Sequence, residues 1–124
     1  MAGILGWINL VLILFMGSIF PIKKMYQKHK TKKLLDLYKT IRKIHPFMGL
    51  TIIIIGIIHG YMQLNTIRIH TGTLILLMVI LMGSVALLGP RIKILKRNWR
   101  FIHRNMGFLL LGTLVIHLFF NSLI

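Results

Sequence analysis

The sequence predicts an all-α integral membrane protein, built as a four-helix transmembrane bundle. Apolar residues make up 56% of the 124 residues. The mean hydropathy of +0.83 is far above that of typical soluble proteins. The apolar residues are also grouped into four long stretches. Each stretch is close to the ~20 residues with which a helix crosses a ~30 Å hydrocarbon core. The length suits one domain, residues 1–124.

The four helices are expected at about residues 3–20, 44–64, 71–89 and 101–122, with basic loops at 21–43 and 90–100. Helices are expected because a segment in lipid must satisfy its own backbone hydrogen bonds. Pro21 and Pro90 follow predicted helix ends, and Pro46 is expected in the first turn of the second helix, where proline is tolerated. Since no basic segment precedes the first apolar stretch, we expect this helix to be retained and not cleaved as a signal peptide.

The basic residues indicate how the chain is oriented. There are 16 Lys and Arg against one acidic residue, Asp36, which gives a formal net charge of +15. Nine of the basic residues lie in 21–43 and six in 90–104. The positive-inside rule therefore places both basic loops in the cytoplasm and both termini on the outer side of the membrane. The expected location is a cell membrane, either an inner or a plasma membrane. The apolar stretches argue against nucleic acid as a partner, although the pI is near 11.5.

Within the first basic loop, residues 31–44 carry apolar side chains at helical intervals. This pattern predicts a basic amphipathic helix that lies on the membrane surface. It equally suits a docking face for an acidic protein. The pattern alone does not distinguish lipid from protein as the partner of this segment.

The residue types that are missing exclude several kinds of site. No cysteine is present, which rules out disulfides, thiolate metal sites and covalent haem attachment through C-x-x-C-H. A single acidic residue rules out catalysis by paired carboxylates and carboxylate metal sites. Histidine is the metal-ligating side chain that remains.

Two predicted helices each carry two histidines, fourteen residues apart. These are His45 and His59 in "HPFMGLTIIIIGIIHG", and His103 and His117 in "HRNMGFLLLGTLVIH". Fourteen helical residues end about 40° short of four full turns, so the two histidines of a helix share a face and lie roughly 21 Å apart. Both helices are predicted to begin in the cytoplasm. His45 is therefore expected level with His103, and His59 level with His117.

Two histidines at each level suit haem iron. A zinc site needs three or four clustered ligands, whereas haem iron needs two axial ligands because the porphyrin supplies the others. Gly49 and Gly107 each follow the first histidine of their helix by four residues, and leave the helix surface bare for a flat macrocycle. The alternative is that the histidines only form hydrogen bonds between helices. The predicted metal ligands are His45, His59, His103 and His117, and the cofactor-binding residues also include Gly49 and Gly107.

Other polar residues have weaker assignments. His29 is expected to be solvated, and His70 to lie at a helix interface. Four basic residues are candidates to pair with haem propionates: Lys43, Arg68, Arg100 and Arg104.

At these residues the chain resembles the two-haem core of the ferric-reductase-like transmembrane domain, which ferric reductases and NADPH oxidases share. It also resembles the wider set of bacterial membrane cytochromes b. The resemblance rests on "HPFMGLTIIIIGIIHG" and "WRFIHRNMGFLLLGTLVIH" and covers roughly the last 80 residues. It implies a bundle that encloses two stacked b haems, an inner one on His45 and His103 and an outer one on His59 and His117.

The resemblance implies transmembrane electron transfer as the function. Ferric reductases and NADPH oxidases carry a flavin and nicotinamide module, and no G-x-G-x-x-G occurs in this sequence. We therefore expect an electron-transfer subunit of an oxidoreductase complex that depends on a partner, a cytoplasmic flavoprotein or iron–sulfur protein. The alternatives are a quinone-reactive cytochrome b that anchors a redox complex, and a haem-free membrane scaffold or assembly subunit.

Overall fold

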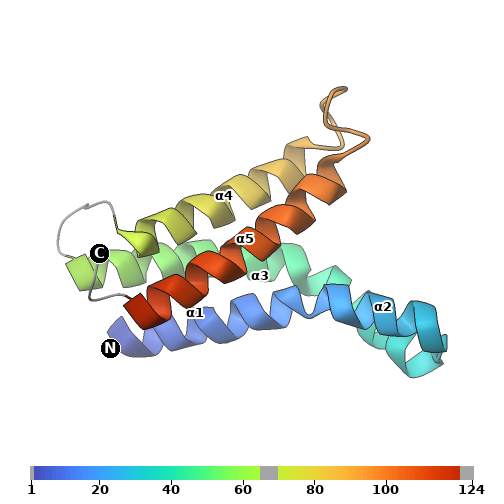
Figure 1. The fold of residues 1–124 in the computed structure, drawn as a ribbon, viewed down its shortest axis with the longest axis horizontal. Coiled ribbons are helices and arrows are strands. Elements are labelled where there is room, and N and C mark those ends of the chain that lie inside the picture. Colours follow the sequence, from blue (N-terminus) through green and yellow to red (C-terminus); the bar gives the residue numbers. More distant parts are fainter. Residues whose placement is uncertain (1, 65–69, 121–124) are drawn as a thin grey trace. The chain divides into compact units, whose positions relative to one another are not determined.

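The computed structural model describes residues 2–64 and 70–120, and these residues form five helices without any strand. The helices are α1 (Ala2–Gly17), α2 (Ile19–His29), α3 (Lys32–Leu64), α4 (Thr71–Leu88) and α5 (Trp99–Phe120) (Figure 1). Four segments of the described chain are long and apolar enough to cross a membrane: Gly3–His29, Lys32–Gln63, Thr71–Leu88 and Trp99–Phe120. The prediction of an all-α chain with four such helices is confirmed.

The exposed side chains of these helices are largely apolar. Trp7 of α1 is 65% exposed, Phe47 of α3 is 73% exposed and Phe119 of α5 is 75% exposed. So many large apolar side chains on a water-facing surface would drive association with other molecules. In a membrane they are stably exposed, because lipid tails are as apolar as the side chains. The fold therefore defines a class, the multi-pass helical membrane proteins.

The chain divides into two compact units, residues 1–59 and residues 60–124. In the first unit, α1 and α3 run antiparallel (Figure 1). Three contacts follow this direction: Gly6 lies against His59, the Asn9 side-chain amide donates to the Ile52 carbonyl at 3.3 Å, and the Met16 side chain reaches Gly49. As α1 advances, its contacts on α3 move back towards the start of that helix.

Proline explains where α1 stops. Pro21 is the third residue of α2, and a proline ring clashes with the carbonyl four residues earlier, which here belongs to Gly17, the last residue of α1. Ser18 occupies the break and its hydroxyl bonds to the Phe15 carbonyl. The first span therefore consists of two consecutive helices instead of the single predicted helix 3–20.

The segment predicted as a basic loop, 21–43, is almost entirely helical, and the helix predicted within it at residues 31–44 is present as the start of α3. Lys30 follows α2 as its C-cap in the left-handed conformation (φ 50°), and its N–H bonds to the Tyr26 carbonyl at 2.7 Å. Helix α3 begins two residues later and continues for 33 residues. At about 1.5 Å per residue it is roughly 50 Å long, some 20 Å more than a hydrocarbon core. We call Ile19–Lys43 the basic hairpin.

The predicted position of Pro46 in the first turn of its helix is wrong. Helix α3 starts at Lys32, so Pro46 lies inside it. The helix continues through Pro46, although a proline has no N–H to give to the carbonyl of Arg42, one turn earlier. The error arose because the charged residues before position 44 were taken to separate the helices, whereas they continue α3.

In the second unit, α4 and α5 run antiparallel and are joined by turns over residues 89–98 (Figure 1). Pro90 follows the end of α4, as predicted. Gly89 is buried at this corner, where a Cβ atom would collide with the Trp99 side chain and the Val85 carbonyl. A glycine is therefore required for α5 to start so close to the end of α4. Helix α5 covers Trp99–Phe120, and residues 121–122 of the predicted helix lie outside the described residues.

Candidate functional site

Helix α3 presents its two histidines on one side. His45, Gly49, Ile52 and His59 all lie on the partly or fully buried side of the helix, while Phe47 and Leu50 between them are exposed. The His59 ring lies against α1 at Gly6, where a Cβ atom would be 2.9 Å from its Cε1 atom. The ring thus occupies space that α1 leaves open only because position 6 has no side chain.

Helix α5 presents its two histidines in the same way. His103, Gly107, Leu110, Leu114 and His117 follow the partly or fully buried side of the helix. This side faces α4, because the contacts of both histidines are with that helix. The described structure therefore gives each unit one helix with two histidines and one neighbouring helix that packs against them.

Hydrogen bonds fix the rings of the α5 histidines. His103 Nδ1 lies 3.0 Å from the Met82 carbonyl, and because a carbonyl only accepts, this nitrogen carries the proton. His117 Nδ1 lies 2.8 Å from the hydroxyl of Thr71, the first residue of α4, which is 9% exposed. When Nδ1 carries the proton, Nε2 holds the lone pair that binds a metal. Metal-ligating histidines are usually held in this manner.

The two predicted cofactor glycines each face a methionine of the same unit. A Cβ atom on Gly49 would lie 3.6 Å from the Met16 methyl carbon, and one on Gly107 would lie 3.6 Å from the Met82 methyl carbon. These are ordinary van der Waals distances to the end of a flexible side chain. A flexible thioether from the first helix of the unit therefore lies over each of these glycines.

The remaining candidates lie near helix ends, except for Lys43, which lies inside α3. Arg100 and Arg104 extend over aromatic rings of their own helix, those of Trp99 at 5.4 Å and Phe101 at 5.7 Å. Lys43 is exposed on α3, and His29 is the exposed last residue of α2. His70 precedes α4 as its N-cap and makes no capping hydrogen bond through its side chain. Arg68 lies outside the described residues.

Sequence reasoning missed the residues of the neighbouring helix that contact the candidate histidines and glycines. These are Gly6, Met16, Thr71, Gly72 and Met82. A signal for four of them was present. The pattern G-x9-M-G-S occurs at residues 6–18 and again at residues 72–84, once in the first helix of each unit.

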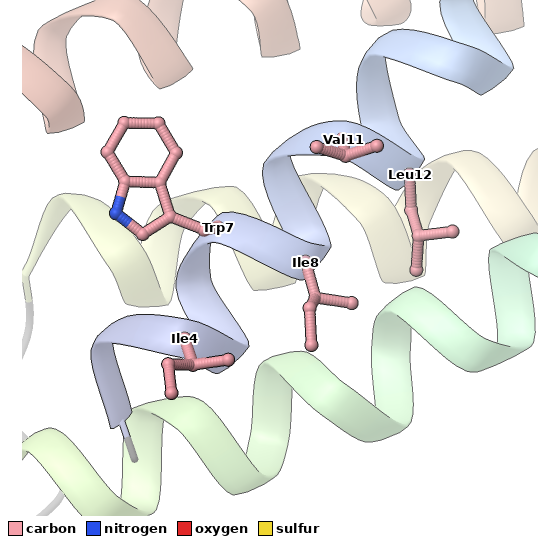
Figure 2. A pocket seen from close by; sticks show the side chains of 5 residues that line it. All are labelled: Ile4, Trp7, Ile8, Val11 and Leu12. Carbon is pink, nitrogen blue, oxygen red and sulfur yellow. The ribbon is translucent and has the colours of Figure 1, made fainter.

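No three His, Cys, Asp or Glu side chains gather around a point within residues 2–64 and 70–120, so these residues build no zinc-type site. A shallow groove runs along α1 and is lined by Ile4, Trp7, Ile8, Val11 and Leu12 (Figure 2). Only Trp7 among these five side chains carries a polar atom, so the groove has the character of a lipid-facing surface.

Comparison of the chain with protein-family models, with curated proteins and with solved structures gave no match. The class of helical membrane protein therefore rests on the four apolar helices, and any narrower function rests on the histidine geometry.

Proposed function

We propose that the protein is a membrane cytochrome b subunit that transfers electrons across the membrane through two bis-histidine b-type haems. The observation that carries this proposal is the state of the α5 histidines. Both rings are bonded through Nδ1 to α4, and histidines that bind a metal through Nε2 are typically held by such a bond at the other ring nitrogen. In this proposal His45 and His103 hold the inner haem, and His59 and His117 hold the outer one.

The residues present fit haem better than another metal group. Each histidine-bearing helix supplies two imidazoles roughly 21 Å apart, which is too far for both to bind one ion. Haem iron takes one imidazole from each of two helices and needs no further protein ligand. One helical turn after His45 and His103, the glycines at positions 49 and 107 expose the helix backbone because they have no side chain. The nearest side-chain atom to each glycine is a methionine methyl group.

The chain's own contribution is to hold, orient and insulate. Bound haem iron would supply the one-electron couple between its ferric and ferrous states. Two histidine ligands on each iron would leave no open position for a substrate, so the proposed role is electron transfer and not bond chemistry. The apolar spans keep water from the rings. The donor is proposed to be a cytoplasmic flavoprotein or iron–sulfur protein.

A second function is favoured by the same hydrogen bonds. Histidines bonded to a neighbouring helix can serve only to hold that helix in place. In this case the chain is a haem-free scaffold or assembly subunit, and His103 and His117 serve only to hold α5 against α4. The two functions differ in whether each Nε2 atom binds iron.

Haem content separates the two functions. The full chain, expressed in a host with ample haem and purified in detergent, is expected to give a b-type reduced spectrum and two haems per chain by pyridine haemochrome assay. His45→Ala and His103→Ala should each remove the inner haem, and His59→Ala and His117→Ala the outer one. A folded wild-type protein without haem would refute the cytochrome. Loss of the same haem in His45→Ala and His59→Ala would refute the proposed pairing.

A further inference from the structure

The two units repeat one pattern of residues. The first helices, α1 and α4, share G-x9-M-G-S, which begins at Gly6 and at Gly72, 66 positions apart. The second helices, α3 and α5, share H-x2-M-G-x9-H, which begins at His45 and at His103, 58 positions apart. The offsets differ by eight residues, which is the extra length of the connection in the first unit. That connection contains the basic hairpin.

Two contacts made by the repeated residues occur in both units. Gly6 lies against the His59 ring in the first, and Gly72 lies against the His117 ring in the second. In each case the nearest ring atom is Cε1, at 2.9 Å and 3.3 Å from where a Cβ atom would stand. The methionine ten residues further along the first helix reaches the glycine ten residues before that histidine, again in both units. The glycine–histidine and methionine–glycine contacts are thus common to the two units.

We propose that the two units are copies of one helical hairpin, and that Gly6 and Gly72 are equivalent positioning residues that set the ring orientation of His59 and His117. The role of these rings as haem ligands rests on the function proposed above, whereas their contacts with the glycines do not. Cε1 is bonded to both ring nitrogens. A group that displaces Cε1 therefore rotates the ring and changes the direction in which Nε2 points.

The distances predict the order of the effects. A Cβ atom at 2.9 Å from Cε1 cannot be accommodated unless the His59 ring or its helix moves. At 3.3 Å the His117 ring needs to give by only a few tenths of an ångström. The Thr71 hydroxyl holds the same ring through Nδ1. Gly6→Ala should therefore disturb its histidine more than Gly72→Ala does.

The chain offers matched controls. Gly3 lies on the same helix as Gly6, and Gly83 on the same helix as Gly72. At both control positions a Cβ atom would meet nothing within 4 Å. Gly3→Ala and Gly83→Ala therefore add the same methyl group and the same helix propensity without contacting a histidine.

The first measurement needs no haem. The full chain in micelles, labelled with ¹⁵N in its histidine rings and prepared without haem, is compared with the four alanine variants. Gly6→Ala should shift the ring resonances of His59 alone, and Gly72→Ala those of His117 alone, with smaller shifts. Gly3→Ala and Gly83→Ala should leave every ring unchanged. Unchanged rings in Gly6→Ala and Gly72→Ala, or equal shifts in the controls, would overturn the positioning role.

The second measurement uses the haem-loaded protein. Gly6→Ala and Gly72→Ala should each change the low-spin electron paramagnetic resonance signal of the same haem, the outer one, because ring orientation sets that signal. A wild-type chain that binds no haem would refute the proposed function, while the resonances of the haem-free protein would still decide the positioning role.

If Gly6→Ala does not fold, Gly6→Ala combined with His59→Ala provides the test, since it removes the ring that the new methyl group meets. Recovery of folded protein in the double variant is expected. No recovery would show that Gly6 serves the helix and not the histidine.

Discussion

Thr71→Val tests whether the hydrogen bond to His117 serves a metal ligand. Valine keeps the shape of threonine and removes only the hydroxyl, which lies 2.8 Å from His117 Nδ1. Thr71 is 9% exposed, so water has little access to replace the lost partner. An interhelical hydrogen bond in a membrane protein is worth about 0.6 kcal/mol on average, and a buried polar group left without its partner costs about 1–3 kcal/mol.

We therefore expect a loss of about 1–2 kcal/mol, which corresponds to roughly 5–30-fold weaker binding of one haem. This agrees with the 10–100-fold typical of residues that orient metal ligands. The midpoint potential of the outer haem should rise, because an imidazole without its Nδ1 partner is less basic and stabilises the ferric state less.

The assay is haem titration of the haem-free chain, followed by redox titration of each haem. Thr113→Val is the control, since the Thr113 hydroxyl donates to the Leu109 carbonyl of its own helix at 2.9 Å and lies 3.6 Å from Met78 Sδ of α4, neither of which is a histidine. Outer-haem affinity and potential equal to those of the wild type in Thr71→Val would refute the reasoning. An equal change in Thr113→Val would do the same.

Three further predictions follow from the glycines and the charges. Gly49→Leu and Gly107→Leu should lower inner-haem content, because overpacking of this kind costs about 1–3 kcal/mol; normal haem content in both variants would assign these glycines to helix packing. Gly89→Ala should lower the thermal stability of the purified protein because of the Trp99 collision, while Gly83→Ala should not; equal melting temperatures would contradict the corner geometry. Haem reduction by a cytoplasmic donor, followed by stopped flow in oriented vesicles, should slow as salt rises, because exposed charges are screened beyond about 8 Å at physiological ionic strength. The rate should become slower and less salt-dependent when four lysines of the basic hairpin are neutralised together: Lys28, Lys30, Lys32 and Lys33. Unchanged kinetics would mean that these charges only orient the chain in the membrane.

Hydropathy located the helices that cross the membrane but not their full lengths. Helix α4 was predicted to within one residue, since its apolar stretch coincides with its helical extent. Helix α3 was predicted twelve residues too short at its start. Charged residues end an apolar stretch, but Lys, Arg and Leu are good helix formers, and the helix continues through them. Apolar length therefore measures a span, whereas helix length depends on backbone conformation.

The histidine-bearing helices could be recognised from spacing, but their neighbours could not. Two histidines on one face follow from the 3.6-residue period alone. The partner of His117 depends on which residue of α4 lies opposite, and a periodic pattern carries no information about the register between two helices. Thr71 is one of several polar residues near a helix start and has no distinguishing feature in the sequence. Gly6 and Gly72 were detectable only by comparing the first helices with each other.

The repeat also separates two roles within the chain. Both units carry the same histidines, glycines and methionines, so each set serves a purpose that the two units share. The basic hairpin occurs only in the first unit, and the eight extra residues lie in that connection. The second unit joins its helices with turns that include four Lys and Arg between residues 89 and 98. The basic hairpin contains none of the residues of the repeated pattern. We therefore assign the basic hairpin to an interaction at the membrane surface, separate from the proposed haem sites, which is why neutralising its lysines should alter donor kinetics and leave both haems bound.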